Sequence, residues 1–292
     1  MKHGIFPRYL PGAAKDIVLR LDKKCKAAFI IMKKERFMNE KELYENWKKE
    51  EETAFIKGWD FSHIEGRYAE ETDFGWDYRE TVLKYLKDGM KLLDVDTGGG
   101  EVLLSLAHPF ENTSASEGYP PNVKLCSETL LPLGIDFRRG NAEEILPFED
   151  ESFDIIINRH GSFNPRDVYR MLKPGGLFIT QQVGAENERE LVELLTDSKE
   201  LPFPQQYLKI AKENFARAGF SVVEEGESYN SIKFFDTGAL VWFARIIQWE
   251  FLGFSVENNF SNIMKAHRII ENNGFVEGHT HRFMLVVQKK VK

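Results

Sequence analysis

Acidic residues and glycines gather in one short turn of this sequence, "DVDTGGG", which runs from Asp94 to Gly100. An apolar segment precedes the turn and a helix-like apolar pattern follows it, as expected where a strand passes into a helix. Glycines at such a point let backbone N–H groups and a helix N-terminus approach a ligand closely. The turn therefore predicts a ligand site at the end of a strand.

The acid inside the turn bears on the kind of ligand. A dinucleotide places its pyrophosphate on the helix N-terminus, where the helix dipole favours negative charge. Asp96 would repel that group, and the spacing G-x-G-x-x-G fails because Leu103 stands where the third glycine is required. S-adenosylmethionine (SAM) carries a sulfonium and no phosphate, so nearby carboxylates suit it. The turn favours SAM over NAD, and an NAD-dependent dehydrogenase is the alternative that shares the fold.

A further carboxylate is expected beside the same ligand. Glu117 ends the next predicted strand, about 20 residues beyond the turn, where a carboxylate can hydrogen-bond ribose hydroxyls. NAD and SAM both contain a ribose, so this feature predicts a nucleoside without choosing between them. The alternative is a glutamate on the surface.

Short apolar strands alternate with helices from Lys91 onward. Strands are predicted at 91–96, 112–117, 135–140, 153–158, 176–183, 221–228 and 281–290. This alternation predicts a parallel sheet covered by helices on both faces. We expect an α/β fold with a Rossmann-like, seven-stranded, mostly parallel sheet, a helical N-terminal extension and a helical cap.

The segments around this core predict the domain limits. A helical pattern covers 15–57, aromatic residues crowd 58–86, and apolar or amphipathic helices are indicated at 236–249 and 260–275. We predict a helical extension over 1–57 and one main domain over 58–292. Within the main domain we predict a lid or access segment over 58–86 and a helical cap inserted at 229–278.

Composition limits the other classes of function. The chain has 292 residues and a formal net charge of −7, which argues against a dedicated nucleic-acid binder. No apolar run reaches the roughly 20 residues of a membrane span. Two distant cysteines indicate no disulfide framework and favour the cytoplasm. His279 and His281 would share a strand face but lack a third ligand, so no metal site is predicted.

The N-terminal segment differs in charge from the rest of the chain. Residues 1–36 hold 10 Lys and Arg against 3 Asp and Glu. A basic arm of this kind could touch RNA or an anionic surface, and the alternative is a solvated helical extension.

Four segments in order carry a family resemblance: "LDVDTGGGE", "SEGYPPNV", "NAEEILPFEDESFDIIINRHG" and "RMLKPGGLFIT". The set resembles the class I SAM-dependent methyltransferases, in particular the group that includes the quinone-biosynthesis enzymes, over residues 76–184. The resemblance implies methyl transfer from SAM to a small-molecule acceptor that it does not specify. RNA methylation and SAM binding without catalysis are the alternatives. One departure is Asp96, where the family usually has glycine.

The resemblance also implies roles for individual residues. Glu117 would hold the ribose hydroxyls, Asn141 would face the adenine amine, and Asn158, Arg159 and His160 would face the sulfonium and the acceptor. Carried over residue by residue, the cofactor site would comprise Asp94, Asp96, Thr97, Gly98, Gly99, Gly100, Glu117, Gly118, Asn141, Ala142 and Asn158.

His160 and Arg159 are the candidate catalytic residues. Transfer from SAM is an in-line displacement that mainly requires acceptor, methyl and sulfur to be held in line, and a base helps only where the acceptor must lose a proton. His160 follows the carboxyl end of a strand, where α/β sheets place ligands, so it is the candidate base. Arg159 would orient an anionic acceptor. The alternatives are a hydrogen bond to a neighbouring loop for His160 and a surface or structural ion pair for Arg159.

The aromatic segment and the cap supply candidate substrate residues. His63, Arg67 and Tyr68 would form a lid over cofactor and acceptor, or else a staple that attaches the N-terminal helix. Trp242 belongs to an aromatic group that forms the core of the cap or walls an apolar acceptor pocket. We expect a monomer or a homodimer.

Overall fold

The computed structural model describes residues 31, 35, 37–55 and 61–291, and these residues form two compact units. The first unit contains the described residues up to Glu70, together with Val192–Asp197 and Ile232–Glu277. The second contains Glu71–Leu191, Ser198–Ser231 and residues 278–291. Most of the basic segment 1–36 and the first part of the predicted helical extension lie outside the described residues.

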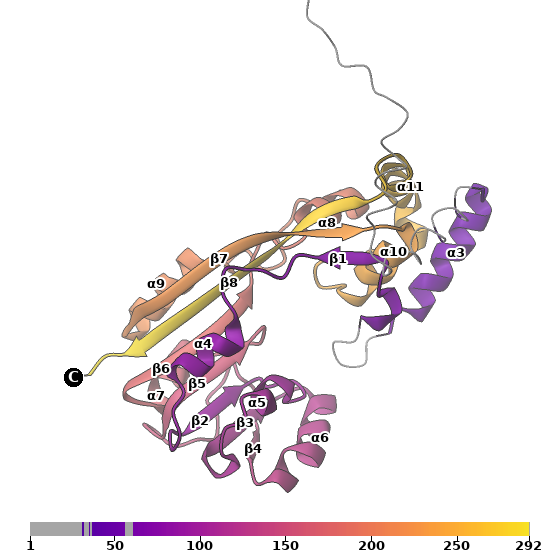
Figure 1. The fold of residues 1–292 in the computed structure, drawn as a ribbon. Coiled ribbons are helices and arrows are strands. Elements are labelled where there is room, and N and C mark those ends of the chain that lie inside the picture. Colours follow the sequence, from indigo (N-terminus) through magenta and orange to yellow (C-terminus); the bar gives the residue numbers. More distant parts are fainter. Residues whose placement is uncertain (1–30, 32–34, 36, 56–60, 292) are drawn as a thin grey trace, which may run out of the picture. The chain divides into compact units, whose positions relative to one another are not determined.

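Parallel strands form the centre of the second unit (Figure 1). Strand β2 pairs in parallel with β3 and β5, β3 with β4, and β5 with β6, whereas β8 is antiparallel to β6. The order of the whole sheet is β1-β7-β8-β6-β5-β2-β3-β4. The strands are β2 (Leu92–Val95), β3 (Thr113–Glu117), β4 (Asp136–Arg139), β5 (Phe153–Arg159), β6 (Leu172–Val183), β7 (Phe220–Phe234) and β8 (Val276–Lys289).

Helices cover both faces of these strands. Leu92 of β2 packs in one core with residues of α4, α5 and α6, while Leu93 and Val95 pack in another with residues of α7 and α9. Successive side chains of a strand point to opposite faces, so one strand serves both cores. The helices are α4 (Tyr78–Tyr85), α5 (Glu101–Ser105), α6 (Pro120–Thr129), α7 (Pro165–Met171) and α9 (Leu208–Ala218). Helix α8 (Arg189–Thr196) begins in the second unit, and its residues from Val192 onward belong to the first. The predicted α/β fold is confirmed.

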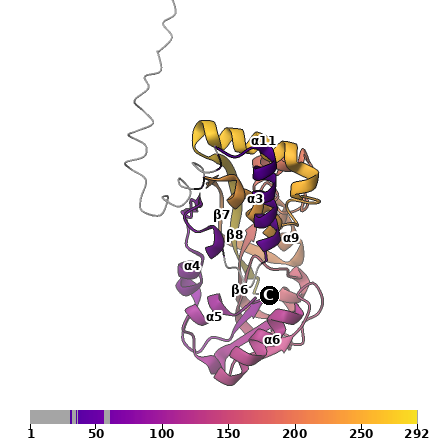
Figure 2. The same ribbon diagram turned by 90° about the vertical axis from the view of Figure 1, so that its right-hand side faces the viewer.

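The first unit is largely helical. It contains α3 (Glu40–Thr53), α10 (Thr237–Ile246) and α11 (Val256–Asn273), and Figure 2 shows α3 beside α11. Each helix begins at a side chain that accepts backbone N–H groups: Asn39 for α3, Asp236 for α10 and Ser255 for α11. Strand β1 (Tyr68–Glu70) pairs antiparallel with the last three residues of β7.

Several elements differ from the sequence expectations, and strand β8, for instance, begins at Val276 and not at His281. The described sheet has eight strands where seven were predicted, because β1 adds a short strand from the aromatic segment. Strand β6 begins at Leu172 and not at Gly176, since a register shift after Phe153 and the left-handed Gly175 let the ladder continue through "KPGG". Strand β7 continues to Phe234 because its end buries apolar side chains.

The predicted domain limits stay predictions. The predicted cap at 229–278 overlaps Ile232–Glu277 of the first unit, and the predicted lid segment 58–86 supplies residues to both units. Within the described ranges, no helix has the length and apolar character needed to cross a bilayer.

Candidate functional site

The glycine turn connects the carboxyl end of β2 to α5. Asp96, Gly98 and Gly100 all have left-handed backbones, with φ of 58°, 65° and 85°. Aspartate tolerates this conformation better than most residues with a side chain, which explains how Asp96 stands where the family usually has glycine. At Gly100 a Cβ atom would lie 2.9 Å from the Leu130 side chain, so glycine lets the turn pack closely there.

The space beside Gly98 is open. A Cβ atom built on Gly98 would meet no heavy atom within 4 Å. Its N–H donates to Glu117 Oε2 (2.9 Å), and its carbonyl accepts a hydrogen bond from Cys126 Sγ (3.1 Å). The backbone of the turn is therefore fixed by protein partners while the Cα side of Gly98 leaves room for a ligand.

Glu117, at the end of β3, is buried and tied to this turn. Its Oε2 accepts from Gly98 N, and its Oε1 accepts from the backbone N–H groups of Gly118 and Tyr119, both at 2.8 Å. Asn122 Nδ2 donates to Oε2 over a longer distance, 3.3 Å. The carboxylate thus joins the loops that follow two adjacent parallel strands.

Two further carboxylates lie in the turn. Buried Asp94 accepts a hydrogen bond from Thr97 Oγ1 (2.5 Å), and Asp96 Oδ2 accepts from Ser162 N (2.9 Å). Burial raises the pKa of Asp94 to about 7, and the charges of Asp96 and Glu117 raise it as well. Burial, followed by the nearby Glu117, also raises the pKa of Asp96. The turn therefore concentrates negative charge that a cationic ligand would stabilise.

The loop after β4 carries the residues predicted to contact adenine. A Cβ atom on Gly118 would lie 3.0 Å from the carbonyl oxygen of Gly140, so the loops after β3 and β4 approach closely. Asn141 is exposed, and its side chain bonds to Glu143 N and Glu144 Oε1, both at 3.1 Å. Ala142 is buried in the core. Contact of Asn141 and Ala142 with adenine stays a prediction.

Asn158 joins three neighbouring strands at their carboxyl ends. This buried residue of β5 donates to the carbonyls of Val95 (2.8 Å) and Ser162 (3.2 Å). Its Oδ1 accepts from Thr180 Oγ1 (3.2 Å) and Gln182 Nε2 (2.6 Å). Its amide is occupied by protein partners, so it holds the strand ends beside the turn, and contact with SAM stays a prediction.

Arg159 and His160 follow at the end of β5, and both reach solvent. His160 has a left-handed backbone (φ 57°), and its N–H donates to the carbonyl of Gln181 (2.8 Å). Desolvation of its ring, then the positive charges of Arg282 and Arg159, hold its pKa well below the ordinary value. The two neighbouring positive charges therefore favour the neutral form of the His160 imidazole.

Two side chains that the sequence analysis did not single out, Gln181 and Trp76, are linked to His160 by hydrogen bonds. Gln181 of β6 is buried, lies 3.1 Å (Nε2 to Nε2) from His160, and accepts a hydrogen bond from Trp76 Nε1 (2.9 Å). The sequence did contain a signal for this role of Gln181. Two consecutive glutamines in the apolar strand "GLFITQQV" place one amide on each face of a buried sheet, where each amide needs hydrogen-bond partners.

A comparison with protein families agrees with this geometry. Residues 93–180 match the family model described as a methyltransferase domain. The matched stretch contains the glycine turn, Glu117, Asn158 and His160. Residues 93–180 are a methyltransferase domain. The resemblance to the class I SAM-dependent methyltransferases is thereby confirmed.

Relatives of the methyltransferase domain cover part of the chain. The chain is 34% identical over 121 residues to a phthiotriol/phenolphthiotriol dimycocerosates methyltransferase of Mycobacterium tuberculosis, covering 38% of this chain and 44% of that protein. It is 31% identical over 102 residues to a ubiquinone biosynthesis O-methyltransferase of Maricaulis maris, covering 32% and 40%. The chain thus spans less than half the length of these relatives.

A solved structure supports the fold beyond the matched stretch. A candidate methyltransferase from Bacillus halodurans has a TM-score of 0.53 at 19% identity, covering 74% of this chain and 99% of that one. At this identity the likeness concerns the fold alone.

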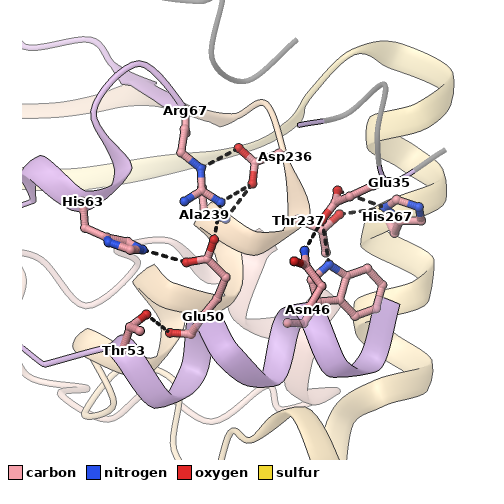
Figure 3. A network of polar contacts seen from close by, with 11 residues as sticks. Glu35, Asn46, Glu50, Thr53, His63, Arg67, Asp236, Thr237, Ala239 and His267 are labelled. Carbon is pink, nitrogen blue, oxygen red and sulfur yellow. Dashed lines mark hydrogen bonds and ion pairs between the residues drawn. The ribbon is translucent and has the colours of Figure 1, made fainter. Parts of the chain in front are cut away.

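The predicted lid residues of the methyltransferase domain lie in the first unit, where a buried polar network holds two of them (Figure 3). Arg67 donates to both carboxylate oxygens of Asp236, through Nε (2.9 Å) and Nη2 (2.6 Å), and to Glu50 Oε1 (2.8 Å). His63 bonds Glu50 Oε2 (2.7 Å). Since Glu50 belongs to α3, these contacts fit the staple alternative, and closure over the cofactor stays a prediction.

The other two candidate substrate residues, one from the predicted lid and one from the predicted cap, are packed against aromatic rings. Tyr68 stacks on Phe234 across the β1–β7 pair, with ring centroids 5.9 Å apart. Trp242 is buried in α10, and the His63 ring stacks on it at 5.2 Å. The surroundings of Trp242 are those of a core residue of the first unit, and a role in acceptor binding stays a prediction.

The two histidines near the start of β8 each face a carboxylate. His279 Nδ1 lies 2.8 Å from Glu190 Oε1, and buried His281 Nε2 lies 3.1 Å from Glu227 Oε1. The two histidines therefore take part in different side-chain pairs.

Proposed function

We propose that this protein transfers a methyl group from SAM to a small-molecule acceptor. The observation that carries the proposal is the open space beside Gly98, next to the buried carboxylates Asp94 and Glu117 and the half-buried Asp96. A sulfonium nucleoside gains from this negative charge, whereas a pyrophosphate would be repelled. The matched methyltransferase domain covers the same residues and supports SAM as the donor.

Glu117 supports a ribose contact without a large rearrangement. Three of its hydrogen bonds come from backbone N–H groups at 2.8 to 2.9 Å, and the fourth comes from Asn122 at 3.3 Å. The Asn122 contact is the weakest by distance. A ribose hydroxyl replaces this contact in our proposal, while the three backbone donors keep the carboxylate in position.

The relatives support a hydroxyl oxygen as the methyl acceptor. One relative is named an O-methyltransferase of ubiquinone biosynthesis, and another is named for phthiotriol. We infer that the acceptor here is also a hydroxyl-bearing small molecule. The chain's part in the reaction is to hold this oxygen, the methyl carbon and the sulfur in line.

Two further expectations belong to this proposal. The buried free thiol of Cys126 supports a reducing compartment, the cytoplasm. Methylation of RNA and SAM binding without catalysis remain the alternatives. Salt-sensitive binding of bulk tRNA would favour the first alternative, and tight SAM binding without transfer to any acceptor would favour the second.

Matched glycine variants test the cofactor site. Gly98 and Gly134 both have left-handed backbones and open space where a Cβ atom would lie, so alanine strains both similarly, by about 1 to 2 kcal/mol. Calorimetry with SAM, its demethylated product and NAD should show binding of the first two ligands and not of NAD. Gly98→Ala should abolish SAM binding, because its methyl group enters the ligand space, and Gly134→Ala should leave it unchanged. Equal SAM affinity in both variants would contradict the proposal.

A further inference from the structure

The hydrogen bonds around His160 determine which ring nitrogen carries the proton. Trp76 Nε1–H lies 2.9 Å from Gln181 Oε1, and an indole N–H can only donate. This contact turns the carbonyl of Gln181 toward Trp76 and its NH₂ group toward His160. The distance from Gln181 Nε2 to His160 Nε2 is 3.1 Å. Because the amide nitrogen only donates, His160 Nε2 must accept, and the proton of the neutral ring resides on Nδ1.

The parts of this chain of contacts are fixed by their surroundings. Gln181 is buried, and its backbone carbonyl accepts the N–H of His160 (2.8 Å). Trp76 packs on Phe74, with ring centroids 5.6 Å apart. A Cβ on Gly226 would lie 2.7 Å from the indole, so glycine in β7 leaves the space that Trp76 fills. The orientation of the Gln181 amide is therefore set by packing as well as by hydrogen bonding.

A general base at His160 would need a free lone pair. In this tautomer the lone pair is on Nε2, which receives the Gln181 N–H, while Nδ1 carries a hydrogen. The charges of Arg282 and Arg159 further disfavour a second proton on the ring. A neutral ring held in this way can donate a hydrogen bond and is a poor acceptor of a proton.

We propose that Trp76 and Gln181 are positioning residues that hold His160 as its Nδ1–H tautomer, so that His160 binds the methyl acceptor as a hydrogen-bond donor. This inference rests on the proposed function and replaces the role of base predicted for His160 from the sequence. In this proposal the Nδ1–H of His160 and the guanidinium of Arg159 both offer hydrogen-bond donors to the acceptor oxygen. The substrate class that fits is a hydroxyl acidic enough to be ionised at neutral pH, such as a phenol with electron-withdrawing ring substituents or a stabilised enol.

The transfer step balances without a base. A lone pair of the acceptor oxyanion forms the new O–CH₃ bond while the electrons of the S–CH₃ bond return to sulfur. The negative charge on oxygen and the positive charge of the sulfonium cancel, giving a neutral ether and a neutral thioether. No proton moves in this step, so a donor at His160 suffices.

Nitrogen-15 NMR of the full chain tests the tautomer directly. The seven histidines are resolved by long-range N–H correlation, and the signals of His160 are those that His160→Gln removes. We expect a protonated Nδ1 and an unprotonated Nε2. Gln181→Glu keeps an acceptor for Trp76 but cannot donate, so it should invert the tautomer to Nε2–H. Gln288→Glu makes the same chemical change at an exposed site on β8 and should leave His160 unchanged. A wild-type Nε2–H tautomer would overturn the inference.

Methyl transfer to a panel of ring-substituted phenols gives the functional readout. Gln181→Glu should lower kcat/KM by about tenfold, the equivalent of one charge-assisted hydrogen bond, with the SAM dissociation constant unchanged. An unchanged or higher kcat/KM would refute the donor role. If the wild type methylates no phenol, the substrate class is refuted, whereas failure of the proposed function would appear as loss of SAM binding in calorimetry.

Discussion

Replacing Glu117 by Gln gives the sharpest test of the site, because it changes one atom without changing the side chain's shape. One carboxylate oxygen becomes an NH₂ group. The N–H groups that donated hydrogen bonds to that oxygen then face a second donor in place of an acceptor. The Oε1 side receives two backbone N–H groups, from Gly118 and Tyr119. The Oε2 side receives Gly98 N–H and the side chain of Asn122, which can rotate to offer its own oxygen. The new NH₂ should therefore face Gly98.

The magnitude follows from the one backbone donor that is left without an acceptor. An unpaired, largely buried N–H costs about 1 to 3 kcal/mol, so the free energy of unfolding should fall by that amount. The ribose hydroxyl should also lose a charged acceptor, a contact of about 1.5 to 3 kcal/mol. The dissociation constant of SAM should rise by about 10- to 100-fold.

Urea unfolding and SAM calorimetry measure the two effects separately, at a temperature where the variant remains folded. Glu128→Gln on α6 is the matched control, since Glu128 is exposed and its ion pair with Lys124 is long at 3.9 Å. The control should change the unfolding free energy by less than about 0.5 kcal/mol. A Glu117→Gln variant that is less stable but binds SAM as tightly as the wild type would refute the ribose contact.

Two further predictions concern other buried charges. Because burial raises the pKa of Asp94 to about 7, the free energy of unfolding should fall as pH rises from about 4 to about 7, as the unfolded chain ionises Asp94 first. SAM affinity should instead rise between about pH 6 and pH 8 as the carboxylate of Asp94 forms, and calorimetry should detect the release of a proton on binding. A SAM affinity that does not change with pH, or a pH dependence that Asp94→Asn leaves unchanged, would contradict this. In the first unit, Arg67→Met leaves fully buried Asp236 without its partner and should cost about 3 to 5 kcal/mol in urea unfolding. Lys265→Met, which loses an exposed ion pair, should cost less than about 1 kcal/mol, and similar losses in both variants would contradict the reasoning.

The sequence could predict the part of the site that depends on local pattern. The turn after β2 and the carboxylate at the end of β3 follow from strand–turn–helix spacing, because parallel strands bring their carboxyl ends to one edge. In the folded chain Glu117 lies against Gly98, as a shared ligand site requires. The alternation of strands and helices likewise predicted the fold.

Contacts between segments that are distant in the sequence could not be predicted from periodicity or motif spacing. Trp76 and Gln181 lie 105 positions apart, and Arg67 and Asp236 lie 169 apart. No periodicity links such positions, so an aromatic and charged segment could be interpreted equally as a lid or as a staple. The role of His160 could not be predicted for the same reason. Its tautomer is determined by the hydrogen-bond partner of Nε2, which is the distant residue Gln181.

The thiol beneath the glycine turn makes the turn observable. Cys126 is fully buried, donates to the carbonyl of Gly98, and has a pKa that burial raises to about 12. Alkylating reagents attack the thiolate, so Cys126 should react only during local openings that release Gly98. In a Cys25→Ser background, the rate of Cys126 alkylation would report how often those openings occur. A ligand that binds at the turn and suppresses the openings would lower this rate, so its binding could be measured without any assay of catalysis.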